Sequence, residues 1–89
     1  MAVIKINGNE YGIKFNLRAA KVYRELTGED ITQMSGVTGI AEFVYSCIVA
    51  YHKSEKTECK ITLDDVFDGL DITAANEAVL SLMPKPTGE

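Results

Sequence analysis

An Asn7-Gly8 pair near the start of the chain lies between two short runs of alternating side chains, VIKI and YGIKF. Successive side chains of a strand point to opposite faces, so each run presents one apolar face. An Asn-Gly pair between such runs is the strongest short-range signal of a β-hairpin, because a type I′ turn needs positive φ at both central residues. The sequence therefore predicts a hairpin over residues 2–15, with a loop that extends to Asn9 as the alternative.

Segments with helical spacing fill most of the remaining chain. Asn16 is a suitable N-cap, and Gly28 fits the position just beyond a helix C-terminus. Thr62, which is followed by acidic residues, and Asp71 or Thr73 are the predicted caps of two later helices. The predicted helices cover about 17–27, 40–53, 63–69 and 72–83, and the glycines within 35–39 indicate a joint before the second helix.

These elements predict a fold class. A two-stranded hairpin is marginally stable alone in water, so helices are expected to pack on its apolar face. The expected class is α+β, with an N-terminal β-hairpin followed by about four α-helices that form a small helical bundle. A chain of 89 residues suits a single domain. We expect this domain to span 1–84 and to be followed by a flexible tail at 85–89.

The charge is negative overall and uneven along the chain. A net charge of −4 argues against a general nucleic-acid binder, which neutralises phosphates with Lys and Arg. Residues 1–28 hold five Lys or Arg and two Glu, whereas residues 61–89 hold six acidic residues and one Lys. Such a subunit could associate head to tail or present two oppositely charged faces; scatter over a solvated surface is the simpler interpretation.

No pattern of residues indicates catalysis, a cofactor or a metal. His52 is the single histidine, and neither Cys47 nor Cys59 has the CxxC or HxxxH spacing of a zinc site. The chain lacks a signal-peptide pattern at its start and an apolar run of about 18–20 residues. We therefore expect an intracellular protein that is not an enzyme and has no catalytic, cofactor-binding or metal-binding residue and no membrane contact.

The segment IAEFVYSCIVAYHK, residues 40–53, is apolar almost all round when it is drawn as a helix. Such a helix is either buried at the centre of a domain or covered by a partner, and both can hold on different sides of one helix. Tyrosines suit an interface because they combine apolar area with a polar tip. The candidate protein-binding residues are Phe43, Tyr45, Val49 and Tyr51, with Val79 and Leu82 from the last predicted helix.

The order IKINGNEYGIKFNLRAAKVYRELTGEDI resembles the N-terminus of tail assembly chaperones of long-tailed, siphovirus-type bacteriophages and prophages of Gram-positive hosts. In that family a short strand, an NG turn and an E-Y-x-x-K-F strand precede a helix that closes on E-x-T-G. The matching residues here are Ile4, Asn7-Gly8, Glu10-Tyr11, Lys14-Phe15, Arg18, Glu25 and Thr27-Gly28. The central apolar helix and the later segment ITLDDVFDGLD also resemble the family pattern.

The resemblance implies a non-enzymatic role in the cytoplasm of the bacterial host. Proteins of this family bind the long, helical tape measure protein before the tail tube forms around it. A frameshifted longer form often recruits tail tube subunits, and self-association into a homo-oligomer is expected. The family has no motif that fixes the client-binding residues. The alternative is a small structural virion component, such as a head–tail connector or tail-completion subunit; a host regulatory or DNA-associated module is disfavoured by the acidic balance.

Overall fold

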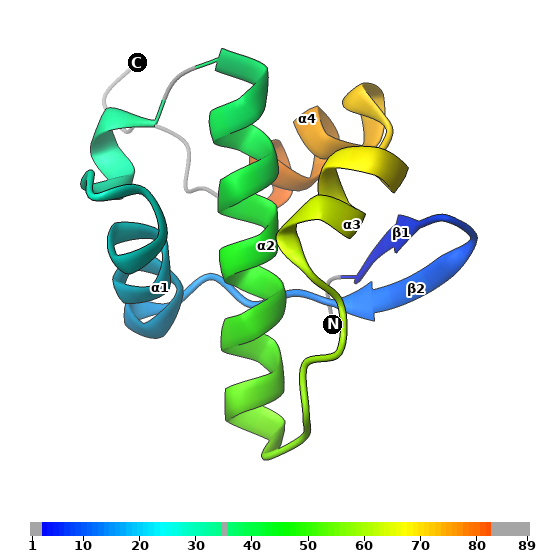
Figure 1. Cartoon of the computed structure of the whole chain (residues 1–89), viewed down its shortest axis with the longest axis horizontal. Helices are drawn as coiled ribbons and strands as arrows, with labels where there is room; N and C mark the ends of the chain where they lie inside the picture. The colour runs from blue at the N-terminus through cyan, green and yellow to red at the C-terminus, as the bar shows by residue number, and fades with distance from the viewer. Residues whose placement is uncertain (1–2, 35, 83–89) are drawn as a thin grey trace.

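The computed structural model describes residues 3–34 and 36–82, and it confirms the α+β class: an N-terminal antiparallel hairpin precedes four α-helices (Figure 1). The elements are β1 (Val3–Ile6), β2 (Asn9–Gly12), α1 (Leu17–Thr27), the 3₁₀ turn η1 (Ile31–Gln33), α2 (Gly36–Glu55), α3 (Leu63–Gly69) and α4 (Ile72–Leu82). Residue 83 and the tail predicted at 85–89 lie outside the described residues.

The hairpin has the predicted two-residue turn. Ile6 pairs with Asn9, and the two residues between them, Asn7 and Gly8, have φ values of 54° and 82°. The loop therefore does not include Asn9. The second strand ends at Gly12, earlier than the predicted 15, because the chain leaves the sheet to meet α2: the Lys14 amide donates a hydrogen bond to the Cys47 carbonyl over 3.1 Å.

Both ends of α1 are fixed by the predicted residues. The Asn16 side chain accepts a hydrogen bond from the Ala19 amide at 3.0 Å. Gly28 takes a left-handed conformation, with φ of 79°, and its amide donates to the Arg24 carbonyl at 2.8 Å. Local capping chemistry alone is sufficient to set these bounds, which is why the sequence predicts 17–27 correctly.

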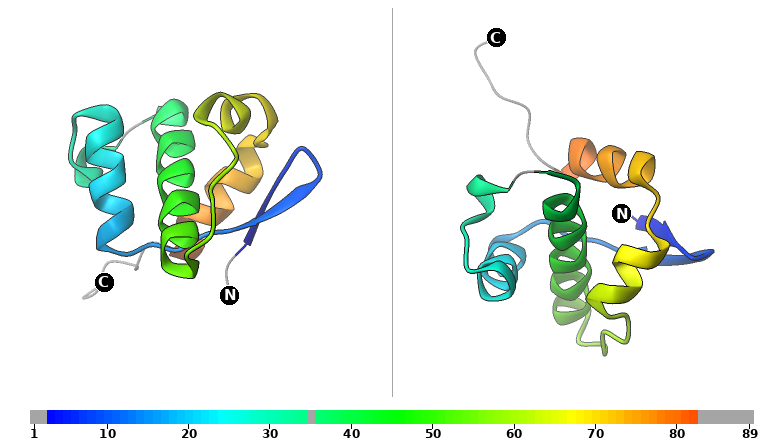
Figure 2. Two further views of the ribbon diagram at one scale, coloured as in Figure 1. Left: turned by 60° about the horizontal axis from the view of Figure 1, so that its bottom comes forward. Right: turned by 45° about the horizontal axis from the view of Figure 1, so that its top comes forward.

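Helix α2 is the centre of the domain. It contacts α1 on one side and β2, α3 and α4 on the others (Figure 2). It begins at Gly36, so the joint predicted over 35–39 is wrong for residues 36–39, which form its first turn. The two glycines serve other needs: Gly36 has a φ of 75°, and Gly39 is buried where an added Cβ would lie 3.2 Å from Met34 Cγ.

The last two helices are capped by side chains and held to the hairpin. Thr62 and Asp65 form a reciprocal capping box at the start of α3, and Asp71, rather than Thr73, caps α4. The Gly69 carbonyl at the end of α3 accepts a hydrogen bond from the Asn7 amide in the hairpin turn. Helix α3 therefore bridges α2 and the hairpin, and it directs the chain into α4.

Candidate protein-interaction site

The structure places Phe43 in the core. Its side chain is 0% exposed, and its ring packs edge-to-face on Phe15 with 5.4 Å between ring centroids. The segment that joins the hairpin to α1 therefore covers this part of α2. A partner could reach Phe43 only after the domain had opened, so we omit it from the proposed binding surface.

Tyr45, Val49 and Tyr51 are half-buried on two sides of α2. Tyr45 packs against the core beside the loop that leads to α3: burial raises the pKa of its phenol, and the nearby Cys59 thiol raises it further. Tyr51 instead lies over β2, where a Cβ added to Gly12 would be 2.5 Å from the Tyr51 ring carbon Cζ. Tyr45 and Val49, one turn apart, share one face of α2 and could contact the same partner, whereas Tyr51 lies on a different face.

Val79 and Leu82 lie on α4, and each is half-buried against the core. Their contribution to a binding surface stays a prediction, as does that of Tyr45, Val49 and Tyr51. The two α4 residues stand one turn apart on one face of their helix. That face is largely occupied by the domain itself, because the core already covers part of both side chains.

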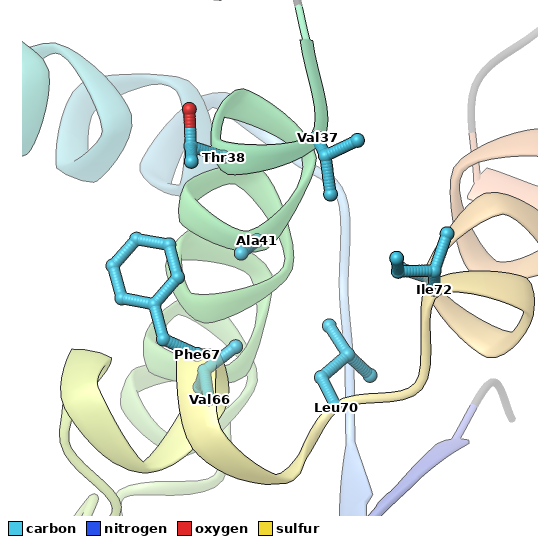
Figure 3. Close-up of a pocket in the computed structure, with 8 residues that line it drawn as sticks. Val37, Thr38, Ala41, Val66, Phe67, Leu70 and Ile72 are labelled. Carbon is cyan, nitrogen blue, oxygen red and sulfur yellow. The ribbon is translucent and has the colours of Figure 1, made fainter.

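An open apolar pocket lies elsewhere, between the first turn of α2, the body of α3 and the start of α4 (Figure 3). Its volume is about 270 Å³. It is lined by Val37, Thr38, Ala41, Val66, Phe67, Leu70, Ile72 and Ala75. The side chains of the lining are apolar apart from that of Thr38, so the pocket is suited to an apolar group rather than to acid–base chemistry.

Three large apolar side chains frame the mouth of this pocket, and each comes from a different helix. Val37, Phe67 and Ile72 are 55%, 42% and 58% exposed. Figure 3 shows them around the opening, and two other lining residues, Ala41 and Val66, are buried. Scattered exposed apolar residues are ordinary, but a group that converges on a hollow is a candidate interaction surface.

One feature of the sequence could have indicated that an apolar side chain is exposed at this site. Val66 and Phe67 are adjacent in a helix of seven residues, and a short helix that packs on one face can bury only one of two neighbours. Val66 is fully buried, and Phe67 is the neighbour left outside. Val37 could not be predicted as a helical residue of the site, because it stands between two glycines that indicated a joint.

Two of the three helices that line the pocket come from an acidic segment of the chain. Residues 61–82, which supply α3 and α4, hold five acidic residues and no Lys or Arg. Asp65 and Asp71 are engaged as helix caps. Asp64 and Asp68, four residues apart, are exposed on one face of α3, next to Phe67 and on the side away from buried Val66. The pocket is therefore apolar, with exposed carboxylates beyond the Phe67 side of its rim.

The groups able to perform other chemistry lie apart from this pocket. Burial raises the pKa of the Cys47 thiol to about 12, and burial also raises the pKa of Cys59. His52 Nδ1 lies 2.8 Å from the Thr57 hydroxyl. Across residues 3–34 and 36–82, no three His, Cys, Asp or Glu side chains gather as metal ligands do. No helix in the same residues is long and apolar enough to cross a bilayer.

Comparison with known proteins leaves the site to be judged by its own geometry. No protein-family model, curated protein or solved structure matches the chain. Within the described residues, the apolar pocket between α2, α3 and α4 is the candidate site, because three large exposed apolar side chains from three helices converge on it.

Proposed function

We propose that this protein is a tail assembly chaperone of a long-tailed bacteriophage or prophage, which binds the tape measure protein and keeps it soluble during tail assembly. The observation that carries the proposal is the open apolar pocket framed by Val37, Phe67 and Ile72. A chaperone of a long helical client needs an accessible apolar surface that covers the client's apolar stripe, because exposure of that stripe to water favours aggregation.

The family resemblance supports the proposal in a second way. Its residues hold structural positions: Asn7-Gly8 forms the hairpin turn, Thr27-Gly28 ends α1, and the segment 61–71 contains capped α3. A pattern of this kind describes a scaffold, and a scaffold without a fixed catalytic motif is what the resemblance implies for a binding protein. The proposed role is accordingly non-enzymatic.

The size of the pocket sets the strength of a single contact. Burial of one large apolar side chain contributes about 1.5–3 kcal/mol, whereas micromolar affinity requires about 8 kcal/mol. One pocket therefore holds one stretch of client weakly and reversibly. Several copies bound along one long client would gain affinity through effective concentration, which is why we include a homo-oligomer and a longer form that contacts tail tube subunits in the proposal.

Co-expression tests the function directly. The tape measure protein encoded beside this chain is expected to be insoluble alone and to become soluble, and to co-purify, when the two are expressed together. A chaperone gene is also expected between the tail tube gene and a very long tape measure gene. A tape measure protein that stays insoluble in the presence of excess chaperone would overturn the proposal.

A second candidate, a small structural virion component, is favoured by the uneven charge. Arg18, Lys21 and Arg24 are exposed on α1, whereas α3 and the start of α4 are acidic, an arrangement that suits subunits packed head to tail in a particle. A head–tail connector or tail-completion subunit would remain in purified virions. A chaperone would be absent from them, and mass spectrometry of purified particles separates the two.

A further inference from the structure

We infer that the pocket between α2, α3 and α4 takes apolar side chains from a client helix whose apolar stripe is flanked by Lys or Arg. The identity of the client rests on the proposed function. The kind of helix that fits follows from the pocket itself, through its size, the three helices around its mouth and the charge at its border.

The volume suits side chains better than a free ligand. Pockets for small molecules typically measure about 300–1,000 Å³, and a cavity of about 150 Å³ accepts a benzene ring. At about 270 Å³, this pocket accepts one large aromatic side chain or two aliphatic ones. Small residues on facing helices, Ala41 and Ala75, leave this room, and both are buried.

The shape of the mouth suits a helix. Side chains three or four residues apart lie on one face of a helix, so two of them can enter one pocket while their neighbours rest on its rim. The rim here is apolar on three sides, because Val37, Phe67 and Ile72 come from three helices. An entering stripe would therefore cover the apolar area that these side chains now expose to water.

The charge selects among such helices. Asp64 and Asp68 are exposed beside Phe67, in a segment, 61–82, that holds five acidic residues and no Lys or Arg. Lys or Arg beside the client's stripe would meet these carboxylates, whereas Asp or Glu there would be repelled. Charges at the rim of an interface contribute mainly to specificity and association rate. The apolar stripe of the client helix would therefore supply most of the affinity, and its flanking charges would determine which helices bind.

The α1 helix of a second copy, which is the basic part of the chain, is a poorer occupant. It exposes Leu17 at 89%. However, Leu17 and Leu26 stand nine residues apart, on opposite sides of α1, and the buried side of this helix is held by Ala19 and Tyr23. Helix α1 therefore offers a single apolar side chain at a time, and an apolar stripe of a separate helix fills the pocket better.

Two synthetic helical peptides serve as probes: one has a Leu stripe flanked by Lys, and the other is identical except that Glu replaces each Lys. Fluorescence anisotropy of the labelled peptides measures binding to the full chain at low salt. We expect the Lys peptide to bind at least about tenfold more tightly than the Glu peptide, with a smaller ratio at high salt because ions screen the Asp side chains.

Variants assign that binding to the pocket. The double variant Val37→Ser, Ile72→Ser removes two exposed apolar side chains from the rim, in the first turns of α2 and α4. It should weaken binding of the Lys peptide by about tenfold or more. The matched control is Leu80→Ser, which changes a 71% exposed residue of α4 outside the pocket and should alter binding less than about twofold. Asp64→Asn with Asp68→Asn should bring the two peptides close to equal affinity.

The outcomes separate this inference from the proposed function. Equal binding of the two peptides, or an unaffected double Ser variant, overturns the inference. Wild-type dimers that become monomers in the double Ser variant, without peptide binding, would instead assign the pocket to a second copy and also overturn it. If the tape measure protein stays soluble with the double Ser variant, the inference fails and the function stands. If peptides bind as expected but the wild type leaves the tape measure protein insoluble, the function fails and the inference stands.

Discussion

Two sides of α2 differ in how completely the rest of the chain covers them. On the closed side, defined by Phe15, Tyr23, Phe43 and Cys47, α1 and the segment before it leave the α2 side chains fully buried. At the open end, defined by Val37, Phe67 and Ile72, α3 and the start of α4 approach the first turn of α2 but leave a pocket between them.

The difference teaches that similar apolar residues have different uses in one small domain. Phe43 and Phe67 are both aromatic residues within helices, yet one is inaccessible and the other is 42% exposed. A small domain can build only a modest core, so leaving large apolar side chains exposed costs it stability. The three exposed side chains at the open end are therefore apolar surface that a partner could bury.

The largest expected effect compares the same change on the two sides. Phe43→Ala should destabilise the domain by about 3–5 kcal/mol, because it leaves a cavity in the packed core. Phe67→Ala should cost only about 1 kcal/mol, because its ring is already partly in water. Urea unfolding followed by circular dichroism measures both. Equal losses would break the distinction between the closed side and the open end.

Alkaline pH should weaken the closed side next. Burial raises the pKa of Cys47 to about 12 from its usual value of about 9, so the unfolded chain releases this proton at a pH where the folded protein keeps it. Stability is therefore lost as pH rises above about 9, by about 1 kcal/mol between about pH 8 and pH 10. The pKa of Tyr23 is also raised by burial, which adds to the loss at higher pH.

The control for the alkaline prediction is Cys47→Ala. Removal of the thiol should lower stability at every pH, through the lost packing, while reducing the difference between the two pH values. Urea titrations at both pH values measure this difference. An Ala variant that keeps the whole wild-type pH dependence would show that Cys47 does not carry the effect.

Loss of the capping box should loosen one wall of the open end. Thr62→Ala removes the side chain that accepts from the Asp65 amide at 3.2 Å and should cost about 1 kcal/mol. Because α3 borders the pocket, its amides should exchange with solvent faster while those of α1 change little. Hydrogen exchange measures this, and Asn16→Ala, which removes the cap of α1, is the matched change on the closed side.

The smallest expected effect is on stability when the rim is made polar. Ile72→Ser should change the unfolding free energy by less than about 0.5 kcal/mol, because the side chain is 58% exposed at the first position of α4. Thermal unfolding measures the change. A large loss would mean that Ile72 belongs to the core, and it would remove the reason to treat the open end as a binding surface.

Turns and helix ends could be predicted from the sequence because their causes are local. Each of these signals acts within a few residues: the Asn7-Gly8 turn, the caps at Asn16 and Thr62, and the helix end at Gly28. In the structure, each lies at the position that the sequence predicted. The start of α2 could not be predicted in this way. A Cβ added to Gly39 would lie 3.2 Å from Cγ of Met34, a residue of the preceding segment, and this close approach of the two segments exists only after folding.

The candidate site lay beyond sequence reasoning for the same reason. Helical spacing showed that residues 40–53 are apolar nearly all round, but not which side would be covered by which neighbour. Phe43 packs against Phe15, in the segment before α1, and Tyr51 packs over β2. The pocket instead lies at Val37, in a stretch that the sequence predicted as a joint. Which apolar faces pair is a property of the packed helices together.

The sequence by itself determined the hairpin, the four helices and the division of charge, because these depend on short-range hydrogen bonding, backbone preference and composition. Only the tertiary structure decided which apolar side chains became core and which stayed exposed. That choice depends on how α3 and α4 dock against the first turn of α2, where Ala41 and Ala75 are too small to fill the space between them. The pocket is the space that this packing left open.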